Sequence, residues 1–286
     1  MADSFSTEWI KVSEPHPHVY LVELRRKPVN AFSEQFWRSF GKVFDDLRAS
    51  STADVRCAVL ASALDKMFTA GLDIKSAASV LSTEGSTDSA RAAHDVHDYI
   101  RTFQAAIRAT ERCHFPVIAA LHGHVIGLGV DIASMCDVRY AAADASFSIK
   151  EVDVGLAADI GTLAYLPKIT GNQSLARELA YSTRPFSAQE ALQLGLVSRV
   201  VPGSRAEVIS AALDLAKTIV EKSPVAVSGT KRLLNHARDN SVDVSLDYTV
   251  IWNSAMLQTK DIAESLVSKQ TKRAPQFAPM NKKAKL

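Results

Sequence analysis

The sequence predicts an α/β fold in which one sizeable core is followed by a helical C-terminal region. Short apolar runs with strand composition at 19–24 and 57–61 flank a stretch, 32–47, with apolar residues at helical spacing. This strand–helix–strand order is typical of α/β proteins. The chain has 286 residues, which is enough for one such core. Its hydrophobic content of 47% against 22% charged residues excludes a mostly disordered protein.

A second strand–helix unit follows, and after Lys150 the apolar spacing becomes helical. The pattern predicts a helix over 90–111, a strand over 116–121, and a helix that ends near Cys136. Further strands are expected at 138–141 and 145–149, and helices at 172–182, 187–194, 205–222, 224–237 and 244–269. We therefore expect a core over residues 1–200 and a helical region with a tail over residues 201–286.

Charge and cysteine content argue against several classes of protein. A net charge of +2 without a long basic run does not predict a nucleic-acid-binding surface. The three cysteines, Cys57, Cys113 and Cys136, are odd in number and lack metal-ligand spacing, so we expect neither a disulfide framework nor a zinc site. No apolar run is long enough for a membrane span.

The two ends of the sequence bear on the compartment. Residues 1–11 include two acids and do not resemble an Arg-rich transit peptide, so no N-terminal targeting signal is expected. The sequence closes on Ala284, Lys285 and Leu286, which resemble the Ser-Lys-Leu address read by the peroxisomal import receptor. A solvated lysine-rich tail is the alternative interpretation. We expect a peroxisomal protein.

Two glycine-containing segments between a strand and a helix could point backbone N–H groups at one oxygen atom. The first runs from Phe68 to Ile74, and the second from Ala119 to Asp131. Glycines in such places are more often plain turns. The occurrence of both segments in one chain favours a function.

Three carboxylates in apolar surroundings are candidates for acid–base chemistry: Asp131, Glu151 and Asp159. Helix N-caps are the alternative for Asp131 and Asp159. Glu151 has no such alternative unless Lys150 or Arg139 pairs with it. If the three acids share a pocket, desolvation and mutual repulsion should raise some of their pKa values, as a carboxylic acid/base pair needs in order to work near neutral pH.

The glycine segments and later motifs resemble the crotonase, or enoyl-CoA hydratase/isomerase, superfamily. The resemblance rests on 70–73, 116–131 and 190–197, and it covers about Val19 to Lys269. Over 150–163, 171–175 and 252–259 the sequence is similar to the Δ3,5-Δ2,4-dienoyl-CoA isomerases. The resemblance implies a crotonase-like spiral of ββα units that holds the coenzyme A and acyl site, with a helical C-terminal trimerisation region.

The same resemblance implies roles for particular residues. Backbone N–H groups of Leu72 and Leu128 would form the oxyanion hole. Substrate and coenzyme A contacts would come from Ala70, Gly71, Leu72, Asp73, Ile74 and Leu128. Relatives usually have Gly at position 128, so Leu128 should either adopt glycine-like backbone angles under strain or shift its amide.

The activity implied is an isomerase that converts 3,5-dienoyl-CoA to 2,4-dienoyl-CoA in the β-oxidation of unsaturated fatty acids. Glu151 would remove the C2 proton, Asp159 would protonate C6, and Asp131 would be an auxiliary acid; Glu151 and Asp159 could also act in the reverse assignment. Neither a metal nor a redox cofactor is expected. Relatives assemble as dimers of trimers, so a homohexamer is expected.

Three alternative functions are distinguished from a dienoyl-CoA isomerase by the acidic residues that they require. An enoyl-CoA hydratase of this superfamily would carry Glu at position 131 and no acid at position 159. A Δ3,Δ2-enoyl-CoA isomerase needs one base. A noncatalytic scaffold or RNA-binding relative with the same fold should lack an acid or carry a basic stripe, and this sequence does neither.

Overall fold

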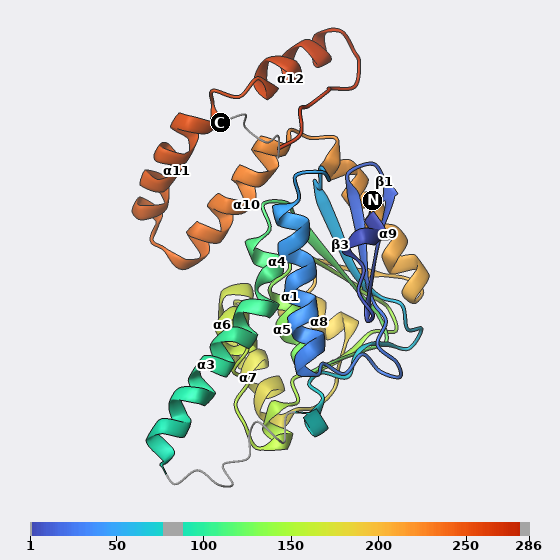
Figure 1. Cartoon of the computed structure of the whole chain (residues 1–286), viewed down its shortest axis with the longest axis vertical. Helices are drawn as coiled ribbons and strands as arrows, with labels where there is room; N and C mark the ends of the chain where they lie inside the picture. Colours follow the sequence, from blue (N-terminus) through green and yellow to red (C-terminus); the bar gives the residue numbers. More distant parts are fainter. Residues whose placement is uncertain (1, 77–87, 281–286) are drawn as a thin grey trace.

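Two β-sheets and the helices around them make up the core of the computed structural model, which describes residues 2–76 and 88–280 (Figure 1). The larger sheet has six strands in the order β1-β2-β3-β5-β7-β10. Strand β1 is antiparallel to β2, and the remaining neighbours are parallel. The strands are β1 (Ile10–His16), β2 (Val19–Leu24), β3 (Cys57–Ser62), β5 (Val117–Leu121), β7 (Val138–Ala142) and β10 (Arg199–Val201).

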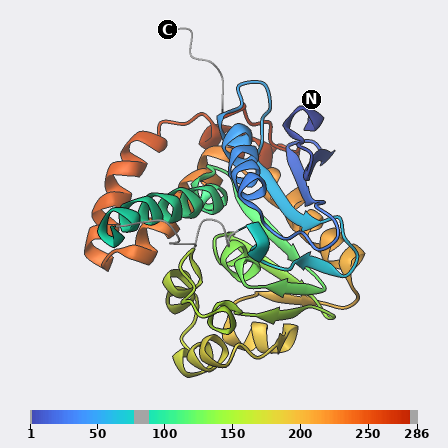
Figure 2. The same cartoon turned by 60° about the horizontal axis from the view of Figure 1, so that its bottom comes forward.

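The six-stranded sheet is buried on both faces, because side chains of a strand alternate between its two sides. Val59 of β3 joins a cluster with helix α9 (Arg205–Val220), whereas its neighbours Ala58 and Leu60 join the main core with helix α1 (Glu34–Ala49). Figure 2 shows the sheet between these two helices. This arrangement explains why β3 reads as a continuous apolar run.

The smaller sheet carries the loops that matter for function. Its order is β4-β6-β8-β9, with β4, β6 and β8 parallel. The strands are β4 (Met67–Thr69), β6 (His124–Ile126), β8 (Ser146–Ser148) and β9 (Phe186–Ser187). Because β4 and β6 are parallel neighbours, the segments that follow them leave the sheet at the same edge. Those two segments are the glycine-containing ones.

The remaining helices complete the core and extend beyond it. Helix α3 packs beside α1, and α5 packs beside α6. Their bounds, with two 3₁₀ turns, are η1 (Ala2–Phe5), α3 (Ser89–Ile107), α4 (Ala109–Arg112), α5 (Leu128–Ser134), η2 (Glu151–Val154), α6 (Thr162–Ile169), α7 (Gln173–Ser182), α8 (Ala188–Leu194), α10 (Pro224–Asp239), α11 (Val242–Met256) and α12 (Asp261–Gln270).

The α/β prediction is confirmed, with corrections in detail. The single helix expected over 244–269 is wrong, because it is two helices separated at 257–260, where the Thr259 hydroxyl accepts the Asp261 N–H. Strand β1 was not predicted, and neither were the short strands β4, β6, β9 and β10, whose two or three residues leave too short an alternation to recognise. Residues 284–286 lie outside the described residues.

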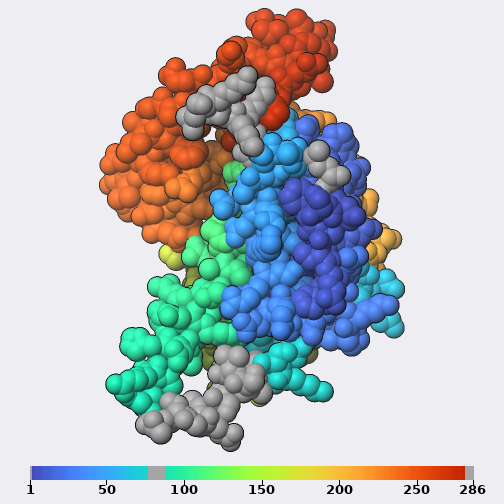
Figure 3. Space-filling model, viewed as in Figure 1, coloured from blue at the N-terminus to red at the C-terminus, as the bar shows by residue number. Residues whose placement is uncertain are grey.

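Helices α10, α11 and α12 form a C-terminal arm beside the core (Figures 1 and 3). The arm is anchored by the buried Lys231 of α10, whose ammonium group donates to the carbonyls of Thr110 and Phe115 and to Asp137 at 2.7 Å. The division at residue 200 stays a prediction, and α9, the first helix after it, packs on the sheet. In the part of the chain described, no helix is long and apolar enough to cross a membrane.

Candidate active site

One pocket gathers nearly all of the residues singled out in the sequence. It lies between the segment after β4, the start of α5, helix α3 and the segment after β8. Its lining includes Ala70, Gly71, Leu72, Ile74, Leu128, Asp131, Glu151 and Asp159. Asp73 does not line it; this carboxylate pairs instead with Arg26 at 3.0 Å.

The first glycine segment contributes Leu72, a pocket residue whose backbone N–H group is not used in the hydrogen bonds of its described neighbours. The Ala70 amide donates to Val29, the Gly71 amide to the Thr69 hydroxyl, and the Asp73 amide to Phe32. The N–H of Leu72 has no acceptor among residues 2–76 and 88–280. A free amide beside a pocket can bind an oxygen atom of a ligand.

The second glycine segment supplies a matching amide. Gly127 donates to Ser148 and Val130 donates to Gly127, while the N–H of Leu128, at the first position of α5, has no acceptor in the described part of the chain. The two segments touch: a Cβ added to Gly71 would stand 2.9 Å from the Ile126 carbonyl oxygen and 3.5 Å from the Leu128 nitrogen. Only glycine permits this approach at φ +88°.

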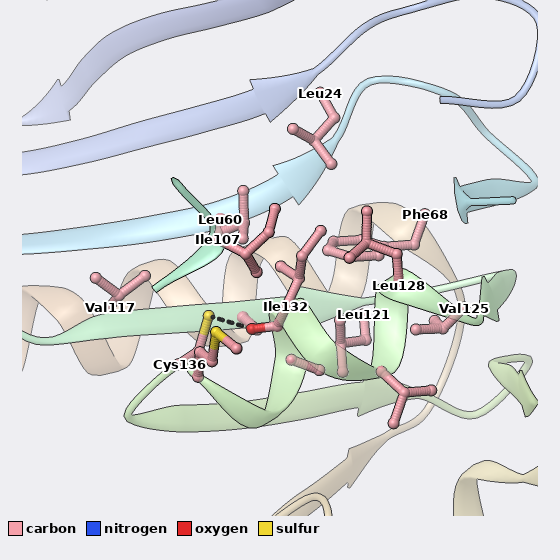
Figure 4. Close-up of a cluster of buried hydrophobic side chains, with 14 of the residues drawn as sticks. Leu24, Leu60, Phe68, Ile107, Val117, Leu121, Val125, Leu128, Ile132 and Cys136 are labelled. Carbon is pink, nitrogen blue, oxygen red and sulfur yellow. Dashed lines mark hydrogen bonds between the residues drawn. The ribbon is translucent and has the colours of Figure 1, made fainter. Parts of the chain in front are cut away.

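The expected backbone strain at Leu128 is wrong. Leu128 begins helix α5, and the left-handed backbone falls on Gly127, with φ of +52°. The Leu128 side chain is 3% exposed and packs into the core near Phe68 and Leu121 (Figure 4). Leu128, a pocket residue, therefore carries its amide in ordinary helical geometry, and its side chain contributes to the core.

Glu151 lies beside the second amide. One carboxyl oxygen, Oε1, lies 3.2 Å from the position of a Cβ on Gly127, and the other, Oε2, is buried with no partner among the described residues. Lys150 pairs with Asp153 instead, so it does not neutralise Glu151. Burial, with a further contribution from the Asp131 carboxyl, raises the pKa of Glu151 to about 7.

Asp131 lies deeper, on the first turn of α5, and is 1% exposed. Its Oδ1 accepts the N–H of Thr162, the first residue of α6, at 2.6 Å. The N-cap alternative is thus partly right, because Asp131 satisfies a helix-start amide, but that amide belongs to another helix. Complete burial raises the pKa of Asp131 to about 6, although this hydrogen bond opposes the rise.

Asp159 occupies the coil between η2 and α6. The residue as a whole is exposed, but its carboxyl is enclosed enough for desolvation to raise its pKa. It is not the N-cap of α6, because Gly161 occupies that position without a side-chain cap. Asp159 thus enters the pocket lining from a different segment than Glu151.

An apolar wall that was not singled out in the sequence completes the pocket. It consists of four residues on one face of α3: Val96, Tyr99, Ile100 and Phe103. Their spacing of three and four residues is the signal that could have identified this face. The helix pattern alone could not show whether the face meets the core or a ligand.

Cys136 and His122 pack in the protein interior as structural residues. Cys136 is buried beside the Ile132 carbonyl (Figure 4), and burial raises the pKa of its thiol to about 12. The buried ring of His122 contacts the Leu64 carbonyl at 2.7 Å. Across the described ranges, no three His, Cys, Asp or Glu side chains are grouped to hold a metal ion.

The geometry suits removal of a proton next to a polarised carbonyl group. Two converging amides can bind an oxygen atom that gains negative charge, and removing one such donor typically costs about 10²- to 10³-fold in rate. A carboxyl group whose pKa lies near neutrality, that of Glu151, stands beside them, and Asp159, a second carboxyl group with a raised pKa, lines the same pocket. The apolar wall of α3 favours a hydrocarbon chain between the two.

Comparisons with known proteins agree with this geometry. Residues 15–280 match the enoyl-CoA hydratase/isomerase family. The mitochondrial Δ(3,5)-Δ(2,4)-dienoyl-CoA isomerase of Mus musculus is 48% identical over 93% of this chain and 80% of its own length. The peroxisomal Δ(3,5)-Δ(2,4)-dienoyl-CoA isomerase of Arabidopsis thaliana is 42% identical over 97% of this chain and 99% of its own. The structure of an enoyl-CoA hydratase from Bacillus anthracis aligns with a TM-score of 0.83, at 28% identity, over 94% of this chain and 99% of that one.

The raised pKa of Glu151 predicts a stability cost that depends on pH. Its pKa rises from 4.5 to about 7 on folding, so the folded chain holds this proton more tightly and loses stability as pH rises from about 5 to 7. We expect Glu151→Gln to raise the free energy of unfolding by roughly 2–3 kcal/mol at pH 8, but by less than ~1 kcal/mol at pH 5, in urea denaturation.

Glu264 provides a control of opposite sign. Hydrogen bonds from Arg273 hold the pKa of this half-buried carboxylate at about 2, so Glu264→Gln should lower stability at pH 8. An equal gain from Glu151→Gln at both pH values would contradict the assignment, because a proton-linked effect must shrink as the pH falls toward 4.5, the ordinary pKa of the carboxyl group.

Proposed function

The chain belongs to the enoyl-CoA hydratase/isomerase family, and we propose that within it the protein is a Δ3,5-Δ2,4-dienoyl-CoA isomerase. The single observation that carries this choice is the presence of two carboxyl groups with raised pKa values, Glu151 and Asp159, in one apolar pocket. A hydratase or a one-base isomerase has no need for an acid at the position of Asp159.

The thioester carbonyl oxygen would accept hydrogen bonds from the Leu72 and Leu128 amides. This placement brings C2 of the acyl chain next to Glu151, because Glu151 Oε1 lies beside Gly127, the residue that precedes Leu128. The geometry therefore supports Glu151 as the group that acts at C2. The coenzyme A portion of the bound substrate would extend out of the pocket past Ala70, Gly71 and Ile74. The ion pair between Asp73 and Arg26 holds the segment that contains these residues.

The reaction moves two protons and two double bonds. Glu151 breaks the C2–H bond and takes the proton, and the electron pair spreads over the thioester carbonyl group and the diene. Asp159 then donates its proton to C6, which forms a C6–H bond and leaves double bonds at C2 and C4. Glu151 ends protonated and Asp159 ionised, and exchange with water resets both groups. The reaction as written requires no cofactor.

In our proposal Asp131 does not contact the reacting carbons but supports Glu151 and the segment that carries Asp159. Its carboxyl raises the pKa of Glu151 and so strengthens Glu151 as a base. Its hydrogen bond to Thr162 also holds the start of α6, directly after the segment that carries Asp159.

Asp159→Asn separates this reaction from its rivals. The substitution keeps the shape of the side chain but removes the proton donor, so kcat for 3,5-dienoyl-CoA should fall by about 10²- to 10⁴-fold, with a smaller effect on KM. The absorbance of the conjugated thioester product measures the rate. Asp98→Asn, at a largely exposed position on α3, is the matched control and should retain full activity.

A nearly wild-type rate for Asp159→Asn would sink the dienoyl assignment. The remaining candidate functions would then be a one-base enoyl-CoA isomerase and a hydratase. Activity on 3-enoyl-CoA would indicate the isomerase, and activity on 2-enoyl-CoA would indicate the hydratase.

We also propose a homohexamer, a dimer of trimers, built through the C-terminal arm. Exposed apolar side chains on α11 support this, with Val250 66% and Ile251 71% exposed in the single chain. Light scattering should report a mass near six times 31.0 kDa. Ile251→Asp should reduce that mass, whereas Lys42→Asp on the exposed face of α1 should not. A monomer at micromolar concentration for the unmodified chain would contradict the proposal.

We propose import into peroxisomes through recognition of Ala284, Lys285 and Leu286 by the import receptor. The resemblance to the Ser-Lys-Leu address and the peroxisomal relative from Arabidopsis thaliana support it, while the mammalian relatives are named mitochondrial. An N-terminally tagged chain should enter peroxisomes, and deletion of Leu286 should leave it in the cytosol. Lys282→Ala, outside the tripeptide, should not change import. Import that survives the deletion, or arrival in mitochondria, would rule the proposal out.

A further inference from the structure

The segment that carries Asp159 has no regular secondary structure, so contacts with other parts of the chain must hold its position. Residues 156–161 form neither helix nor strand, and both Ala157 and Asp159 are exposed. Two hydrogen bonds from other parts of the described chain hold this segment at Asp159 and at Thr162, the residue that follows it. One joins the Thr162 amide to Asp131, and the other runs from the side-chain Nε2 of Gln104 to the backbone carbonyl of Asp159 at 2.6 Å.

The Gln104 bond acts on the residue that must deliver the proton. The carbonyl carbon and Cβ of Asp159 are both attached to its Cα, so a hydrogen bond that holds the carbonyl group restrains the Cα and limits the carboxyl group to rotations about the Cα–C bond and the two side-chain torsions. A carboxyl group on exposed coil would otherwise sample a wider range of positions. A displacement of about 1 Å at a reacting group can cost on the order of 10² in rate.

Gln104 also belongs to the helix that forms the apolar wall. It follows Phe103 directly and lies one turn after Ile100, and both of those side chains line the pocket. Helix α3 therefore contacts the space for the acyl chain and holds Asp159 at once. The hydrogen bond from Gln104 thus links the helix that forms the wall to the backbone of the residue that carries the carboxyl group.

We propose that Gln104 is a positioning residue for Asp159, which aligns the Asp159 carboxyl group with the distal carbon of an acyl chain held against α3. This inference rests on the proposed function, because it assigns Gln104 a role only if Asp159 transfers a proton.

The test compares Gln104→Ala and Gln104→Glu in the full-length assembled protein. Both remove the N–H donor, and Gln104→Glu keeps the size of the side chain. We expect kcat for 3,5-dienoyl-CoA to fall by about 10- to 100-fold in each, with KM changed by less than about threefold. Thr102→Ala is the matched control on the same helix, since its hydroxyl donates to the Asp98 carbonyl within α3, and it should keep the wild-type rate.

A second readout separates positioning from a general loss of structure. In D₂O, Glu151 and the two amides can exchange the C2 proton of the substrate for deuterium without Asp159. The ratio of C2 exchange to isomerisation should therefore rise in Gln104→Ala, in the same direction as in Asp159→Asn. In the Asp159→Asn background, Gln104→Ala should lower the rate by less than about twofold, because the group that it positions is already inactive.

Wild-type kcat in both Gln104 variants, an unchanged ratio of exchange to isomerisation, or full additivity with Asp159→Asn would each overturn the inference. If Asp159→Asn is severely impaired while the Gln104 variants are normal, only this inference fails. If Asp159→Asn is itself normal, the proposed function fails and the inference falls with it.

Discussion

The close approach of the two glycine segments is the constraint on which the rest of the pocket depends. Strands β4 and β6 are parallel neighbours, so the chain leaves both at one edge of the small sheet. Gly71 lies so close to the Ile126 carbonyl that a side chain there would collide, and Gly127 has a backbone that favours glycine. The free amides of Leu72 and Leu128 result from this contact. The position of Glu151 next to Gly127 follows from it as well.

Burial then gives the acids their chemistry. Asp131 and Glu151 are held in a poorly solvated region where ionisation is costly, so their pKa values rise toward neutrality. The unpartnered oxygen of Glu151 is a feature that a purely structural carboxylate would not retain. Such a group makes the folded chain less stable than it could be, as is common where a site is built for reaction.

The C-terminal arm is connected to the site as well as to the core. Arg238, near the end of α10, pairs with Glu111 at 2.6 Å, and Glu111 also accepts the hydroxyl of Tyr165 on α6 at 2.6 Å. Helix α6 begins directly after the segment that carries Asp159. The buried Lys231 fixes the other half of α10. The arm that exposes apolar side chains is thus held in a defined orientation, as an assembly surface requires.

Local sequence patterns were sufficient to predict the α/β class, most long helices, the two glycine segments and the three candidate acids, because periodicity, glycine placement and isolated charges in apolar runs are local properties. Tertiary structure decided the rest. Only the folded chain shows that Leu128 is unstrained, that Asp131 caps a helix distant in sequence, that Asp73 faces away toward Arg26, and that Gln104 reaches Asp159. These facts depend on contacts between residues far apart in the chain, and no local pattern specifies which of many polar groups will meet. The physical reason is that periodicity tells which face of an element is apolar, whereas packing decides what that face meets.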